Sequence, residues 1–110
     1  MTSLLTNKVA AITGGVTGIG RAIALAYLRH GARVVVNHYP DPTSAAHFQD
    51  MLAEAGPDAG ASLIAVPGDI ALASTATELV ETTVRAFGRL DVFVSNAGVC
   101  QFQDFLRYVG

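Results

Sequence analysis

The stretch "ITGGVTGIGRAIALAYL", residues 12–28, decides the fold because its pattern changes halfway along. An apolar run leads into a cluster of glycines, and from Gly20 onward apolar residues recur at helical spacing. We therefore predict a buried strand over 9–13, a glycine-rich turn, and a helix that stops at His30 and Gly31.

Further strands and helices alternate along the rest of the chain. Apolar runs over 33–37, 63–66 and 90–95 have the length and the β-branched content of buried strands. Asp41, which is followed by proline, is typical of a helix N-cap, and a third helix is expected to be capped by Ser74. The apolar stripe predicted for that third helix consists of Leu79, Val80, Thr83, Val84 and Phe87.

The resulting order, βαβαβαβ, predicts the fold class. Strands that are apolar on both faces and alternate with helices form a parallel sheet whose two faces are covered by helices. Right-handed crossovers favour the strand order 3-2-1-4. We expect an α/β protein of the Rossmann type, a doubly wound parallel sheet with four strands and three helices, in which residues 1–110 form one domain.

The glycines of the first turn predict an anion-binding site. In such a sheet this turn lies at the carboxyl edge, where the N-terminus of a helix offers unpaired N–H groups to a phosphate. Gly14 permits the sharp turn, Gly18 lets the backbone approach the ligand, and Gly20 lets the helix pack tightly on the strand. Glycines that merely break a strand are the alternative. A P-loop is excluded because Gly20 is followed by Arg21 and Ala22 rather than by lysine and a hydroxyl residue.

Composition and charge exclude several classes of protein. The chain has 7 basic and 9 acidic residues and a formal net charge of −2, and it has no basic stripe for nucleic acid or an anionic membrane. Its N-terminus has neither the charged region of a signal peptide nor the apolar length of a membrane span, so we expect a cytoplasmic protein. Cys100 is the single cysteine, and the three histidines are too scattered to hold a metal.

Three motifs resemble those of the short-chain dehydrogenases/reductases. "TGGVTGIG" at 13–20 is similar to the cofactor fingerprint of this family, "GDI" at 68–70 to its acidic motif, and "SNAG" at 95–98 to its N-N-A-G, with Ser95 in place of the first asparagine. Each motif follows a predicted strand, and together they extend over nearly the whole chain. The resemblance implies the N-terminal half of such an enzyme, which binds NAD or NADP.

The resemblance also implies the roles of individual residues. Asp69 would contact the adenine ring, and Asn96 would bridge the sheet edge and a cofactor ribose. A helix-entry cap for Asp69 and an ordinary turn after Asn96 are the alternatives. The predicted cofactor-binding residues are Gly14, Thr17, Gly18, Ile19, Gly20, Asn37, His38, Asp69, Ile70, Asn96, Ala97 and Gly98.

The end of the second strand leaves the choice between NAD and NADP open. An acid there binds a ribose 2′-hydroxyl and repels a 2′-phosphate, but this chain has Asn37 and His38. The basic residue that NADP-preferring members of the family often carry just before the second fingerprint glycine is replaced by Thr17. Asn37 can hydrogen-bond a hydroxyl or a phosphate, and His38 can add positive charge. We therefore expect use of both cofactors with at most a weak bias.

The residues that would carry catalysis are missing from the chain. The family transfers hydride with a serine and a Tyr-x-x-x-Lys pair, whereas Lys8 is the only lysine here and no tyrosine stands four residues before it. We assign no catalytic residue and expect the 110-residue chain to be inactive by itself, as a half-domain that is truncated before the catalytic half. The resemblance implies a dimer or tetramer for full-length members of the family, but not for this fragment.

Within the family, stretches such as "NKVAAITGGVTGIGRAIALAYLRHGARVVVNH", residues 7–38, resemble fungal sugar dehydrogenases. That resemblance implies a small-molecule substrate, an aldose such as L-rhamnose, which is oxidised at its anomeric carbon to a lactone. A 3-oxoacyl reductase, whose N-terminal half is much alike, is the alternative enzyme. A dinucleotide-binding sensor or regulatory fragment without turnover is the alternative outside the enzymes.

Overall fold

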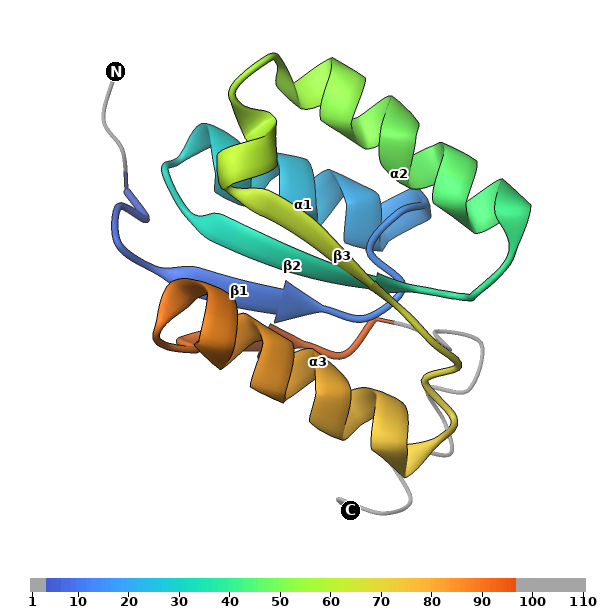
Figure 1. Cartoon of the computed structure of the whole chain (residues 1–110). Helices are drawn as coiled ribbons and strands as arrows, with labels where there is room; N and C mark the ends of the chain where they lie inside the picture. Colours follow the sequence, from blue (N-terminus) through green and yellow to red (C-terminus); the bar gives the residue numbers. More distant parts are fainter. Residues whose placement is uncertain (1–3, 97–110) are drawn as a thin grey trace.

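Strands and helices alternate along the chain in the predicted order. The structure is a computed structural model that describes residues 4–96. Its elements are β1 (Val9–Ile12), α1 (Gly18–Arg29), β2 (Arg33–His38), α2 (Pro42–Ala55), the short 3-10 helix η1 (Ala59–Ala61), β3 (Leu63–Pro67), α3 (Ala73–Phe87) and β4 (Val92–Val94) (Figure 1).

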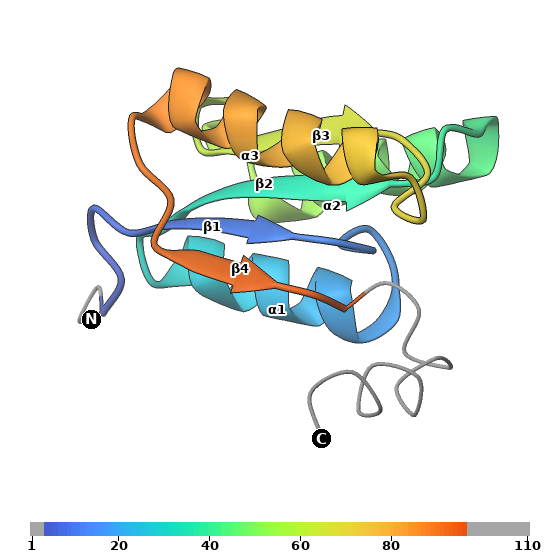
Figure 2. The same cartoon turned by 90° about the horizontal axis from the view of Figure 1, so that it is seen from below.

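The four strands form one parallel sheet in the order β3-β2-β1-β4, which confirms the predicted fold class and topology. Ile12 at the end of β1 pairs with Val36 of β2 and with Val94 of β4. Because the strands run in one direction, their carboxyl ends meet at a single edge of the sheet (Figure 2). The turn before α1 and the loops before α2 and α3 leave from that edge.

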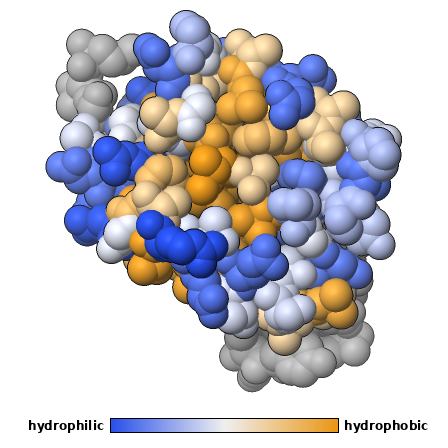
Figure 3. Space-filling model, in the orientation of Figure 1, coloured by the Kyte–Doolittle hydropathy of each residue, from blue (hydrophilic) through white to orange (hydrophobic). Residues whose placement is uncertain are grey.

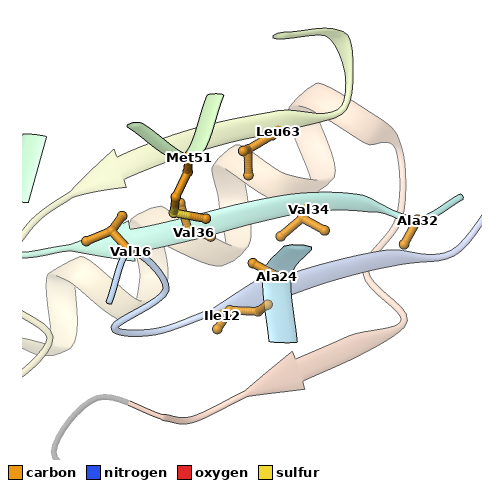
Figure 4. Close-up of a cluster of buried hydrophobic side chains, with 8 residues drawn as sticks. All are labelled: Ile12, Val16, Ala24, Ala32, Val34, Val36, Met51 and Leu63. Carbon is orange, nitrogen blue, oxygen red and sulfur yellow. The ribbon is translucent and has the colours of Figure 1, made fainter. Parts of the chain in front are cut away.

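Both faces of the sheet are covered, as a doubly wound fold requires. The core under α1 and α2 consists of Ile12, Val16, Ala24, Ala32, Val34, Val36, Met51 and Leu63 (Figure 4). The core under α3 consists of Ala11, Val35, Val66 and Leu79. Successive residues of β1 and β2 alternate between these two clusters, so the central strands are buried on both sides, which explains their unbroken apolar runs.

The starts of α2 and α3 are built differently. Asp41 caps α2 as predicted, because its Oδ1 accepts a hydrogen bond of 2.6 Å from the backbone N–H of Ser44. That bond lowers the pKa of Asp41 below its ordinary value. The predicted cap of the third helix, Ser74, is wrong: α3 begins at Ala73, and its N-cap position is held by Leu72, which has no side-chain acceptor.

The buried face of α3 also differs from the predicted stripe. Thr75, Leu79 and Thr83, four residues apart, are the buried positions, whereas Val80 and Val84 are 37% and 45% exposed. A buried threonine is tolerated here because the Thr83 hydroxyl donates a hydrogen bond of 2.7 Å to the carbonyl of Leu79. The apolar pattern of the sequence therefore wrongly predicts that Val80 and Val84 belong to the buried face of α3.

The edge strand β4 is tied to β1 at its start. Asp91 Oδ2 accepts a hydrogen bond of 2.9 Å from the backbone N–H of Val9. The Arg89 guanidinium donates two hydrogen bonds of 2.9 and 2.7 Å to the same carboxylate and lowers the pKa of Asp91. Because β4 has only 3 residues, this tie helps to fix its register and with it the position of Asn96.

The surface of the described chain mixes apolar and polar areas. Apolar side chains gather along the middle of the face shown in Figure 3, over β3 between α2 and α3. β3 is an edge strand of the sheet. Among residues 4–96, no helix combines the length and the apolar character needed to cross a bilayer.

Candidate functional site

A cavity of about 570 Å³ lies at the carboxyl ends of the strands. It is lined by the turn after β1, by the loops after β2 and β3, and by Asn96, which follows β4. The predicted site residues that line the cavity are Gly14, Thr17, Gly18, Ile19, Asn37, His38, Asp69, Ile70 and Asn96. Topology thus brings together residues that are up to 82 positions apart in the sequence.

The first turn gives the cavity its backbone wall. Gly14 and Gly18 both have left-handed backbones, with φ of +60° and +55°, which glycine adopts without steric cost. No atom lies within 4 Å of the place where a Cβ on Gly18 would stand. Thr17 occupies the N-cap position of α1 without a side-chain capping bond, so the side chain at this helix start leaves the first N–H groups available to a ligand.

Gly20 lies behind this turn and does not line the cavity. A Cβ there would collide with the backbone carbonyl oxygen of Gly14 and would stand 2.6 Å from Nδ2 of Asn96. The tight packing predicted for Gly20 is therefore against the turn and the end of β4. Gly15 is the glycine that packs against a strand, since its Cβ would stand 2.6 Å from Cγ1 of Val36.

Asn96 joins β4 to the glycine turn. Its backbone N–H donates to Oγ1 of Thr13 at 2.9 Å, and its Nδ2 donates to the carbonyl of Gly14 at 3.1 Å. The side chain therefore bridges the end of β4 and the glycine turn, and its predicted contact with a cofactor ribose stays a prediction. Ala97 and Gly98 lie outside the described residues, so their predicted roles stay predictions.

Both side-chain amide hydrogens of Asn37 are donated to backbone carbonyls of the chain. The side chain is 2% exposed, and its Nδ2 donates to the carbonyl of Val66 at 3.1 Å and to that of Gly68 at 3.0 Å. Only the side-chain oxygen remains, and an amide oxygen can accept but not donate. Asn37 therefore offers an acceptor rather than a donor to the cavity, and its predicted contact with a cofactor ribose stays a prediction.

Replacing Asn37 with leucine is expected to lower the free energy of unfolding by about 2 kcal/mol, because a carbonyl of β3 and one in the loop after it lose their donor. Urea denaturation measures this change. Gln49→Leu removes the same amide from an exposed position of α2 and should change stability by no more than about 0.5 kcal/mol. Equal effects of the two substitutions would show that the Asn37 bonds contribute nothing.

The far side of the cavity holds an imidazole and a carboxylate. His38, 6% exposed, places Nδ1 2.7 Å from the carbonyl oxygen of Tyr39 and stacks its ring against Phe48, with centroids 6.3 Å apart. Asp69 accepts a hydrogen bond of 2.9 Å from the N–H of Ala71 through Oδ1. That bond closes the turn that precedes α3 rather than capping the helix itself.

The sequence reasoning missed some of the lining residues, which are Val16, Tyr39, Ser44 and Gly68. Ser44 could have been found from the predicted cap at Asp41, which places it in the first turn of α2 at the sheet edge. Gly68 belongs to the quoted "GDI" motif, and a Cβ there would stand 2.7 Å from Cγ2 of Thr75. Within residues 4–96, no three His, Cys, Asp or Glu side chains come together as a metal site.

A doubly wound parallel sheet with a glycine-rich first turn and a cavity at the carboxyl ends of its strands defines a Rossmann-type α/β domain. Within that class, this chain belongs to the short chain dehydrogenase family, whose family model matches residues 8–109. The family that the three sequence motifs indicate is thereby confirmed.

Two curated enzymes and one solved structure are among the proteins to which this chain is similar. The L-rhamnose-1-dehydrogenase of Scheffersomyces stipitis is 52% identical over 97% of this chain, and the L-rhamnose 1-dehydrogenase (NAD(P)(+)) of a Sphingomonas species is 44% identical over 94%. The solved apo structure of glucose dehydrogenase from Caenorhabditis elegans is 31% identical over 96% of the chain, with a TM-score of 0.76. The chain spans 41%, 39% and 46% of these three proteins, respectively.

Proposed function

We propose that this chain is the NAD(P)-binding part of a short-chain dehydrogenase that oxidises an aldose at its anomeric carbon to a lactone. The observation that carries the proposal is the open backbone at Gly18, where nothing lies within 4 Å of a Cβ position. It opens a 12-residue helix whose N–H groups and dipole favour negative charge. A diphosphate would be held there.

The rest of the cavity suits the remaining parts of a dinucleotide. His38 and the side-chain oxygen of Asn37 would face the adenosine ribose, and Asp69 with Ile70 would face the adenine ring. Asn96, on the other side of the glycine turn, would face the nicotinamide half. When bound, the nicotinamide supplies the hydride acceptor, and the residues described here bind and orient it without taking part in proton transfer.

The relatives support the substrate class. Two L-rhamnose dehydrogenases, from a yeast and a bacterium, match more than nine-tenths of the chain, at 52% and 44% identity. The name of the bacterial relative includes both NAD and NADP, which agrees with weakly biased cofactor use. The Tyr-x-x-x-Lys pair of the family is assigned to no residue of this chain.

The proposal is tested with the protein expressed from the gene together with any coding sequence that follows codon 110. NADH and NADPH formation is measured with L-rhamnose, and oxidation of the reduced cofactors is measured with an acetoacetyl thioester. We expect turnover with L-rhamnose and lactone as the product. Turnover with the thioester instead would establish the 3-oxoacyl reductase, and dinucleotide binding without turnover of either substrate would establish a sensor.

A further inference from the structure

A second cavity lies beside the first turns of α2. Its volume is about 540 Å³, which is close to that of the cavity at the glycine turn and within the usual range for sites that bind small molecules. Within residues 4–96, His38 is the only residue that lines both cavities. The second cavity therefore has walls of its own, which come from the loop before α2, from α2 itself and from the end of β3.

Most of these walls are apolar and held in place. Pro67, the last residue of β3, is fixed by the parallel register that pairs it with His38. Pro40 and Pro42 lie on either side of the cap of α2, and a proline ring holds φ at about −65°. Phe48 is stacked against the ring of His38, with centroids 6.3 Å apart. An apolar ligand therefore meets a preformed surface and requires little ordering of the protein.

The carboxylate of Asp41 supplies negative charge to this cavity. The hydrogen bond of 2.6 Å from the backbone N–H of Ser44 lowers the pKa of Asp41, so the group is ionised at neutral pH. A carboxylate can accept about four hydrogen bonds, and the donors from Ser44 and Thr43 leave part of that capacity unused. Among the described residues, no lysine or arginine lines the cavity or forms an ion pair with Asp41.

The charge of Asp41 decides the sign of the ligand. The N-terminus of α2 carries the positive end of the helix dipole, which is equivalent to about half an elementary charge. A full negative charge at the N-cap exceeds it, and the Gln49 amide that also lines the cavity is neutral. His38, another titratable side chain of the lining, adds positive charge only when it is protonated. An apolar cavity with net negative charge fits a cation that carries an apolar body and disfavours an anion.

We propose that this second cavity binds a small organic ammonium ion, that is, an amine carried on an apolar or aromatic body. The ammonium group donates a charge-assisted hydrogen bond to the carboxylate of Asp41. The apolar body packs against Phe48 and the three prolines of the lining. Because the walls of the two cavities are separate apart from His38, the ammonium ion and a dinucleotide bind at the same time.

The probe is benzylammonium, and benzyl alcohol is its uncharged counterpart with the same ring. Both are titrated into the ¹⁵N-labelled chain at pH 8, and the chemical shifts of the backbone amides are followed by NMR. We expect benzylammonium to shift the amides of the first turns of α2, with a dissociation constant of about 1 mM, as is usual for so small a ligand. Benzyl alcohol should bind about three- to tenfold more weakly.

Asp41→Asn tests the charge without removing the cap, because asparagine keeps a side-chain oxygen that accepts from Ser44. This variant should bind benzylammonium about three- to tenfold more weakly than the wild type and benzyl alcohol equally well. Asp50→Asn is the matched control, since Asp50 is an exposed acid of the same helix that does not line the cavity. Equal benzylammonium affinity in Asp41→Asn and Asp50→Asn would overturn the proposal.

Ala45→Leu tests the location of the site. Ala45 is exposed on α2 and lines the cavity, whereas the neighbouring Ala46 is exposed and does not. Leucine at position 45 should fill part of the cavity and weaken benzylammonium binding by about fivefold or more, while Ala46→Leu leaves it unchanged. Displacement of benzylammonium by saturating NAD⁺ would place the probe in the first cavity and contradict a separate site.

Each variant is made in the 110-residue chain and in a chimera whose residues 1–96 replace the matching part of the Scheffersomyces enzyme, so that poor folding of one form leaves the other to decide. In either form, a wild-type protein whose α2 amides do not shift with benzylammonium would also overturn the proposal. That result would leave the proposed function untouched, because dinucleotide binding is measured separately.

Discussion

Gly18→Ala is expected to weaken the binding of both NAD⁺ and NADP⁺ by about 10- to 100-fold. Gly18 borders the cavity with a φ of +55° and open space beside it, so a methyl group would stand where we propose that the diphosphate meets the backbone of α1. Losing one or two charge-assisted hydrogen bonds to backbone N–H groups costs affinity of this order. Titration calorimetry with each dinucleotide measures the change.

Gly88→Ala is the matched control for Gly18→Ala. Gly88 ends α3 with a φ of +81°, and nothing lies within 4 Å of its Cβ position. Both substitutions carry the same backbone penalty, about 1–2 kcal/mol of folding free energy for a left-handed residue, but only Gly18 borders the cavity. If both variants bound dinucleotides as the wild type does, the diphosphate would have to lie elsewhere.

The sheet could be predicted from the sequence because its signals are local. Apolar runs such as 33–37, glycines at the turn and a capping Asp41 each act over a few residues, and the handedness of crossovers then leaves one natural strand order. Helix faces were less predictable. Val80 and Val84 are exposed while Thr75 is buried, because the position of a helix on the sheet, rather than its composition, decides which residues face the core.

Most residues that line the cavity could be named from the motifs and the strand ends, but their hydrogen bonds could not. The amide of Asn37 is used by carbonyls 29 and 31 residues away, and no local pattern reports a contact of that range. The consequence is chemical, because both amide hydrogens of Asn37 are donated to the chain and only its side-chain oxygen is left to meet a ligand. Long-range hydrogen bonds thus set which atoms of a residue that lines the cavity are free to bind a ligand.

Gly20→Ala is expected to destabilise the protein by about 3 kcal/mol. In most helices this substitution stabilises by up to about 1 kcal/mol. Here the new Cβ would collide with the backbone carbonyl of Gly14 and stand 2.6 Å from Nδ2 of Asn96. A backbone carbonyl cannot rotate away as a flexible side chain does, so α1 must move from the turn, at a cost near the upper end of overpacking. Equilibrium urea denaturation measures the loss.

The same displacement should disturb the cavity as well as the stability, because the Gly14 carbonyl that accepts the bond from Asn96 lies directly against Gly20. Gly60→Ala is the control, since Gly60 has nothing within 4 Å of its Cβ position and no left-handed backbone. That variant should be as stable as the wild type or more stable by about 0.4–1 kcal/mol. A Gly20→Ala protein as stable as Gly60→Ala would mean that the close contact between the first turn, α1 and the end of β4 does not hold the site together.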